Sequence, residues 1–268
     1  MSHQSWFRWH VGYVFWGAVL FLIAGTALYP TGVQYVEDAL YAINPSAERA
    51  LHYAERHFDA KRSRLYDIER TEYFLREAAA LDPGLPYLYH ELARVAFLRG
   101  NFTRALALIN TQISLHGTAT PSSYYVRGLI EGYMGKYNEA ATDYEIYLES
   151  DPENWAAIND YAWVLLKANR AKEAAREAAR GLQVFPDNPW LLNTFAIALY
   201  ETGELEAALA SAEKAMASVR EVTEQQWLTA YPGNDPQIAG AGITALRKSI
   251  EDNMHSIKKA ITEGEIQL

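Results

Sequence analysis

The chain of 268 residues contains no cysteine. Disulfide bonds, thiolate metal sites and a cysteine nucleophile are therefore excluded. Basic residues are in the minority, because 24 lysines and arginines stand against 33 aspartates and glutamates, for a formal net charge of −9. Nucleic-acid binding needs a basic face, so we expect no nucleic-acid partner. Apolar side chains are not scarce: 50% of the residues are hydrophobic and 13% aromatic, which excludes a disordered protein.

The sequence also lacks the motifs of catalysis. Its seven histidines form no His-Glu-x-x-His or comparable ligand pair, and the five-residue spacing of His52 and His57 puts them on different faces of a helix. No glycine-rich phosphate loop and no Gly-x-Ser-x-Gly elbow occurs, and Gly-Ala-Gly at 240–242 falls inside an expected helix. We therefore predict no catalytic residue, metal ion or cofactor, and no enzymatic activity.

The sequence does contain one pattern of apolar, small and turn residues that is repeated four times between Pro83 and Arg220. The turn residues Gly100, Gly135, Asn169 and Gly203 are 35, 34 and 34 residues apart, and Ala105, Ala140, Ala174 and Ala208 have the same spacing. Each copy has two apolar helical stripes on either side of its turn. Small residues lie mid-way along each first helix, where two backbones must approach closely: Ala93, Gly128, Ala162 and Ala196. This period predicts stacked helical hairpins, because a single hairpin cannot bury its own apolar face.

The pattern resembles the tetratricopeptide repeat, a helix-turn-helix unit of which the third copy carries Trp155, Tyr161-Ala162, Ala174 and Pro186. The resemblance covers roughly half of the chain and implies an all-α, right-handed solenoid over 83–220. It also implies that the first helices line a concave groove in which ligands usually bind. The second copy departs from the family's pattern, because Arg127 and Glu131 replace apolar residues.

A run of nineteen uncharged residues, Val11 to Tyr29, precedes the repeats. As a helix it spans roughly 28 Å, about the hydrocarbon thickness of a bilayer, so we predict a transmembrane helix over 11–29. Because Arg8 precedes the run and no lysine or arginine occurs from 30 to 48, residues 1–10 are expected in the cytoplasm and the repeats outside it. The alternative is a signal peptide cleaved near Gly25-Thr26-Ala27, with a secreted product.

The two segments that flank the repeats are expected to be helical. Residues 30–82 predict linker helices and a degenerate repeat: Val33 to Ile43 as a short helix, a helix start at Asn44-Pro45, and Asp59–Arg64 as a solvated turn. Residues 221–268 predict capping helices, with a long helix over 238–261.

The long C-terminal helix has one apolar stripe. Its members are Ile243, Leu246, Ile250, Met254, Ile257 and Ile261. Their spacing also suits a coiled-coil seam, so a homo-oligomer formed through 238–261 is the alternative to capping.

The concave stripe of the first helices is the candidate binding site for a protein or peptide. It contains Tyr87, His90, Arg94, Tyr125, Leu129, Tyr133, Asn159, Trp163, Trp190, Asn193, Ile197 and Tyr200. Asn159 and Asn193 occupy equivalent places, and their amides offer both a donor and an acceptor to an extended peptide backbone. Some of the aromatic residues could instead pack between adjacent first helices.

Three functions are compatible with these patterns. The first is a membrane-tethered scaffold that binds a protein or peptide in the groove. The second is a structural subunit of a cell-envelope complex, assembled through the anchor and the C-terminal helix. The third is a glycan-binding or enzymatic envelope protein that uses the aromatic groove as a sugar platform, although no carboxylate pair supports hydrolysis.

Overall fold

The computed structural model describes residues 29–230 and 234–266, and this part of the chain is helical without any strand. The first described helix covers residues 29–43. The other elements are α2 (Ala47–His57), the 3-10 turn η1 (Ala60–Arg62), α3 (Ile68–Leu81), α4 (Leu88–Leu98), α5 (Phe102–His116), the 3-10 turn η2 (Gly117–Ala119), α6 (Ser122–Tyr133), α7 (Tyr137–Ser150), α8 (Trp155–Lys167), α9 (Ala171–Val184), α10 (Pro189–Thr202), α11 (Leu205–Val219), α12 (Glu224–Ala230), the 3-10 turn η3 (Pro236–Ile238) and α13 (Ala239–Ile266).

The four repeats form helical hairpins that pair α4 with α5, α6 with α7, α8 with α9 and α10 with α11. The periodic turn residues adopt left-handed backbone conformations, with φ of 72° at Gly100, 78° at Gly135, 60° at Asn169 and 86° at Gly203. Only glycine enters this region without a steric cost, and asparagine tolerates it better than most residues. The turn chemistry read from the sequence therefore produces the turns that are observed.

The small residues of the pattern lie where helices touch most closely. Ala105, Ala140, Ala174 and Ala208 are all fully buried. At Gly128 an added Cβ would lie 3.2 Å from the carbonyl oxygen of Ala140 and 3.2 Å from the ring of Tyr144, so nothing larger fits without a shift. These contacts make an all-α solenoid of stacked hairpins, as the repeat period predicts.

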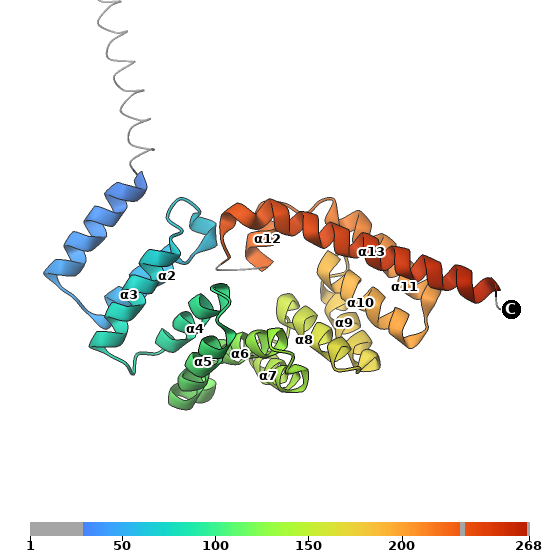
Figure 1. Ribbon diagram of the computed structural model, residues 1–268, viewed down its shortest axis with the longest axis horizontal. Coiled ribbons are helices and arrows are strands. Elements are labelled where there is room, and N and C mark those ends of the chain that lie inside the picture. The colour runs from blue at the N-terminus through green and yellow to red at the C-terminus, as the bar shows by residue number, and fades with distance from the viewer. Residues whose placement is uncertain (1–28, 231–233, 267–268) are drawn as a thin grey trace, which may run out of the picture.

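The hairpins follow one another along an arc, and the C-terminal segment closes the open side of that arc (Figure 1). Helix α13 packs against α11 and α10, while α12 packs against α13 and reaches η1, near the other end of the chain. The cluster at this closure joins Ala60 of η1 with Trp190, Trp227 and Leu228. The segment Asp59–Arg64, expected to be a solvated turn, is therefore partly an internal contact, and Ala60 is only 2% exposed.

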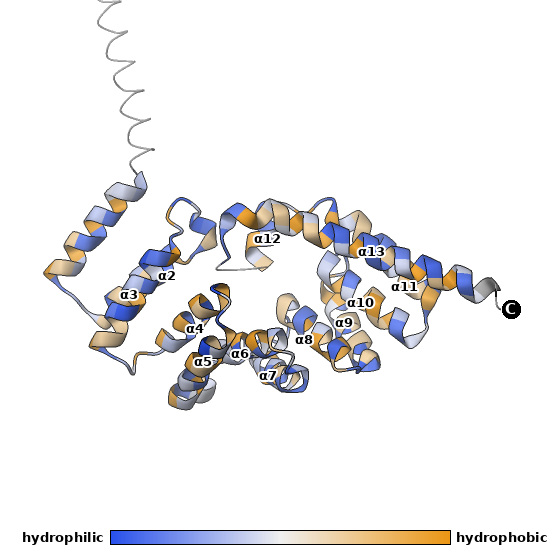
Figure 2. Ribbon diagram, viewed as in Figure 1, coloured by the Kyte–Doolittle hydropathy of each residue, from blue (hydrophilic) through white to orange (hydrophobic). Residues whose placement is uncertain are grey.

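The apolar stripe of α13 lies against the last repeat. Ile250 packs with Leu192, Ala215 and Val219, and Ile257 packs with Ala196 and Leu199. The charged residues between them give α13 the alternating hydropathy seen along its length in Figure 2. The stripe that suggested a coiled-coil seam is thus covered by α10 and α11 of the same chain.

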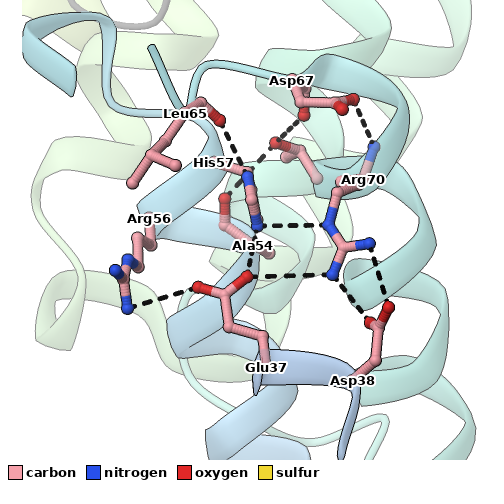
Figure 3. Close-up of polar contacts among 9 residues, drawn as sticks. Glu37, Asp38, Ala54, Arg56, His57, Leu65, Asp67 and Arg70 are labelled. Carbon is pink, nitrogen blue, oxygen red and sulfur yellow. Dashed lines mark hydrogen bonds and ion pairs between the residues drawn. The ribbon is translucent and has the colours of Figure 1, made fainter. Parts of the chain in front are cut away.

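The helix of residues 29–43 is held to α2 and α3 by a buried polar cluster, which we call the polar joint (Figure 3). Its centre is the Glu37 carboxylate, with Oε2 lying 2.7 Å from His57 Nε2 and Oε1 lying 3.3 Å from an Arg56 guanidinium nitrogen. His57 donates through Nδ1 to the carbonyl of Leu65 at 2.8 Å. Arg70 pairs with Asp38 at 2.7 Å. Because Glu37 is 2% exposed, this helix is docked through charge as much as through apolar contact.

The N-terminal region differs from the sequence-based expectation at the start of α2. The helix start expected at Asn44-Pro45 is wrong by two residues, because Ser46 caps α2 by accepting from the backbone N–H of Arg49. The predicted transmembrane span lies outside the described residues except for its last residue, Tyr29. Among the described helices, none has the length and apolarity needed to cross a bilayer.

Candidate binding face of the repeats

The candidate residues lie on, or directly before, the first helix of each hairpin. Most of them fall in two zones along these helices. His90, Tyr125, Asn159 and Asn193 lie in the first half of α4, α6, α8 and α10. Arg94, Leu129, Trp163 and Ile197 lie about one turn further on, and Tyr133 and Tyr200 lie near the C-terminal ends of α6 and α10. The two halves have different surroundings.

The side chains in the first half form a ladder of hydrogen bonds between neighbouring elements. His90 Nδ1 lies 3.1 Å from Ser123 Oγ, the Tyr125 hydroxyl donates to Asp160 at 2.9 Å, the Thr194 hydroxyl donates to Asn159 Oδ1 at 2.8 Å, and Asn253 Nδ2 donates to Asn193 Oδ1 at 2.9 Å. Each repeat therefore bonds to the next, and α13 takes the place of a fifth repeat. The two asparagines, predicted to hold a peptide backbone, have their carboxamide oxygens engaged within the chain.

Burial shapes the electrostatics of this ladder. It lowers the pKa of His90 to about 4, with Glu91 acting in the opposite direction, so the imidazole is neutral near pH 7. Burial also raises the pKa of Asp160 to about 6, against hydrogen bonds from Tyr125 and Asn159 that lower it. The first half of the face consequently presents a neutral histidine and a carboxylate that is already hydrogen-bonded within the chain.

The C-terminal segment covers part of the hollow that was expected to be open. Trp190 is 7% exposed, and its ring lies 5.1 Å from that of Trp155 between centroids. It packs in the same cluster as Trp227 of α12. Asn193, 8% exposed, is bonded to α13. At Trp190 and Asn193 the concave side is therefore occupied by α12 and α13 of the same chain, and the prediction of an open groove is wrong at these two residues.

Two further candidates lie at the α2 end of the arc. Tyr87 has φ of 66° and sets its ring edge-on to that of His90, 5.6 Å away. Arg94 donates to both carboxylate oxygens of Glu91 and lies over the ring of Phe58 at 4.5 Å. The contact of Arg94 with Phe58 joins the first repeat to the end of α2, whereas Tyr87 contacts a residue of its own repeat.

The second half of the first helices keeps large side chains in solvent. Tyr133 is 62% exposed, Trp163 37% and Tyr200 38%. Leu129 and Ile197 are partly buried beside them. We call these five residues the open aromatic face. It lies towards the hairpin turns. The C-terminal segment covers the first turns at Trp155 and Trp190, and α13 also packs on α10 at Ala196 and Leu199.

Aromatic residues that are not among the predicted site residues support the open aromatic face: Phe97 on α4, Phe102 at the start of α5 and Tyr137 at the start of α7. The Tyr133 ring lies 4.9 Å from that of Phe97 and 5.7 Å from that of Phe102. The Trp163 ring lies 6.1 Å from that of Tyr137, with the Lys167 ammonium 5.5 Å from its centroid. Phe102 and Tyr137 are 35 residues apart, each at the start of a second helix. That spacing was a signal that could have found them.

The residues that depart from the repeat pattern form a polar cluster between α6 and α7. Arg127 donates to both carboxylate oxygens of Asp143, each at 2.6 Å. Burial first, and then the Asp143 carboxylate, raise the pKa of Glu131 to about 7, while Arg127 opposes the shift. Arg127 and Glu131 therefore replace an apolar contact with an ionic one.

Across the described residues, no three histidine or carboxylate side chains come together as a metal site would need.

Comparison with known proteins agrees with this fold. Residues 125–189 match the family model described as "Tetratricopeptide repeat". A solved structure of MamA AMB-1 is 17% identical, with a TM-score of 0.54, and the match covers 63% of this chain and 99% of that one. A structure of MamA MSR-1 is 18% identical, with a TM-score of 0.53, over 64% of this chain and 97% of that one.

A third solved structure, YrrB, is described as "a TPR protein with an unusual peptide-binding site". It is 17% identical with a TM-score of 0.50, and the match covers 70% of this chain and 97% of that one. No protein in the curated set matches significantly. At these identities the likeness concerns the fold alone.

Proposed function

We propose that this chain of tetratricopeptide-type repeats is a membrane-tethered scaffold that captures a peptide segment of another protein on the open aromatic face. The observation that carries the proposal is the exposure of Tyr133, Trp163 and Tyr200 on three successive first helices. Aromatic rings supply a large contact area for little loss of side-chain entropy, and they are enriched among the residues that dominate binding energy. YrrB, which has a similar fold, is described as peptide-binding, and this likeness supports the same class of ligand.

The chemistry of the face favours a segment with apolar or aromatic side chains. Leu129 and Ile197 lie about one turn before Tyr133 and Tyr200 on the same helices, while Lys167 offers one exposed cation beside Trp163. The engaged ladder in the first half of the helices offers few unused donors or acceptors. Affinity is therefore expected from buried rings rather than from a clamp on the peptide backbone.

Replacing both Tyr133 and Trp163 with alanine is expected to weaken peptide binding at least tenfold, because two ring anchors of about 1–2 kcal/mol each are lost. A random peptide library displayed on phage supplies the probe. Peptides enriched on the wild-type protein are synthesised, and their dissociation constants are measured for each variant. Circular dichroism checks that the helical content is unchanged.

Tyr73→Ala is the matched control, because Tyr73 is 49% exposed on α3, away from the repeats. This variant should bind the enriched peptides as tightly as the wild type does. The proposal fails if the double variant also retains its affinity, or if the wild type enriches no peptide above background.

The tether is proposed from the nineteen uncharged residues that end at the first described helix. A run of that length matches the hydrocarbon core of a bilayer. After an alkaline carbonate wash of membranes, the full chain is expected to stay in the pellet, and a variant without residues 1–28 is expected to be released. Release of the full chain would contradict the tether. A mature N-terminus beginning after Ala27 would instead indicate a cleaved signal peptide.

A further inference from the structure

The helix of residues 29–43 leaves its apolar side uncovered. Its inner side is fixed by the polar joint, which is directed at α2 and α3 (Figure 3). Tyr41 is buried on the same side, with its ring 5.6 Å from that of Phe74 on α3. Helices usually bury an apolar stripe and expose a charged one. This helix instead buries a glutamate and leaves several apolar side chains in solvent, so the described part of the chain does not account for them.

Five of its apolar side chains make one continuous stripe, in which Val33 is partly buried, and Tyr35, 73% exposed, lies on another side of the helix. The stripe consists of Tyr29, Val33, Val36, Leu40 and Ile43, with steps of four, three, four and three residues. Val36 is 58% exposed, Leu40 49% and Ile43 80%. Alternating steps of four and three are the spacing of a coiled-coil seam, in which the side chains of one helix fit between those of another.

A shallow groove beside the stripe has room for part of a second helix. It has a volume of about 420 Å³ and lies between the 29–43 helix and α2, where Tyr53 and Arg56 form its far wall. Four stripe residues line it: Tyr29, Val33, Val36 and Leu40. The groove and the stripe therefore form one apolar surface along the side of the helix.

The flanks of the stripe suit self-association better than a specific foreign helix. The exposed residues beside it are Gly32 and Ala39, which are small and uncharged. Two-stranded seams choose a different partner mainly through opposite charges at such flanking positions, and these are missing here. Two copies of the same helix side by side bring apolar residues against their equals, and the charges that line the groove, Arg56 and Glu37, are already paired within each chain.

We infer that a second copy of this chain covers the stripe, with the two 29–43 helices parallel and equivalent residues facing each other. The parallel orientation rests on the proposed tether, because two anchors in one bilayer make both helices leave the membrane in the same direction. Helix α13, the segment that the sequence suggested for self-association, has its stripe covered by α10 and α11. The 29–43 helix presents the uncovered seam.

Single cysteines test this arrangement without interference, because the chain has no cysteine of its own. The full chain carrying Ile43→Cys is reconstituted in phosphatidylcholine vesicles at low density and in detergent micelles, and is then oxidised. We expect a disulfide-linked dimer that forms at least tenfold faster than with Ala42→Cys, an exposed position on another side of the same helix. Val36→Cys, at the middle of the stripe, should also crosslink quickly.

The other outcomes overturn either the inference or the tether on which its orientation rests. Equal rates at Ile43 and Ala42 would indicate random collision, and crosslinking at Val36 without Ile43 would indicate antiparallel helices. A chain that enters vesicles but never crosslinks would leave the tether intact and remove the second copy. Conversely, a chain that crosslinks at Ile43 but does not associate with vesicles would support the seam and contradict the tether. Adding Leu40→Asp to Ile43→Cys should slow crosslinking at least tenfold, since a charge would then enter the seam.

Discussion

Replacing Gly242 with alanine is expected to lower the free energy of unfolding by about 1 to 3 kcal/mol, as overpacked sites do. A Cβ added at Gly242 would lie 2.3 Å from two atoms of the Trp227 indole and 2.5 Å from a third. Trp227 is 5% exposed and shares a cluster with Ala60 and Trp190, so its ring has little room to move. The added methyl group should separate α12 from α13 and open the closure between the two ends of the arc.

Gly240→Ala is the matched control, two residues earlier on the same helix. Its Cβ would meet only Glu224 Oε1, at 3.4 Å, the far end of a flexible side chain. Because alanine is a better helix former than glycine, this variant should be more stable than the wild type by about 0.5 to 1 kcal/mol. The two neighbouring glycines thus predict changes of opposite sign in the same helix.

Thermal unfolding and hydrogen exchange measure the two effects. Gly242→Ala should reduce Tm by about 2 to 12 °C, given roughly 2–4 °C per kcal/mol for a domain of this size. It should also speed amide exchange in residues 224–230, whereas Gly240→Ala should not. In a Trp227→Ala background the cost of Gly242→Ala should vanish. If both glycine variants shift Tm in the same direction, α12 does not pack on α13 as described.

Glu131→Gln is expected to stabilise the protein at pH 8 by about 1 to 3 kcal/mol, and to change little at pH 5. The folded-state pKa of Glu131 is raised from 4.5 to about 7, by burial first and by Asp143 second. Between these values the folded chain binds more protons than the unfolded chain, so stability falls as the pH rises. The loss is complete above pH 7. A carboxamide carries no charge and avoids it.

Chemical denaturation of wild type and variant at several pH values between 5 and 8.5 measures this difference. His90 contributes in the opposite direction, because its folded pKa of about 4 makes stability rise with pH up to about 6.5. Both proteins keep His90, so its contribution cancels in the comparison. Glu139→Gln, an exposed carboxylate on α7, should show no such trend. A Glu131→Gln effect of equal size at pH 5 and pH 8 would contradict the assignment.

The parts of the fold that could be predicted from the sequence are those in which one repeat contacts the next. The turn glycines and the small residues recur every 34 or 35 positions because each copy meets the same neighbour in the same way. The stripe of α13 is equally readable, since a helix that covers a repeat needs a continuous apolar face. Contacts that recur in every repeat produce a periodic sequence pattern. That pattern identified the first helices, and so Tyr133 and Trp163 could be predicted as candidates from the sequence.

Three features were decided by the tertiary structure alone. The contact between α12 and η1 joins segments about 165 residues apart that belong to no repeat, and a contact made once leaves no period in the sequence. The partners of Asn159 and Asn193 depend on the small displacement between successive helices. In this fold the Asn159 amide bonds to Thr194 and the Asn193 amide bonds to Asn253, so neither oxygen is left for a ligand. The 29–43 helix docks through Glu37 because α2 places His57 and Arg56 beside it. Local periodicity predicts only that such a helix has an apolar side.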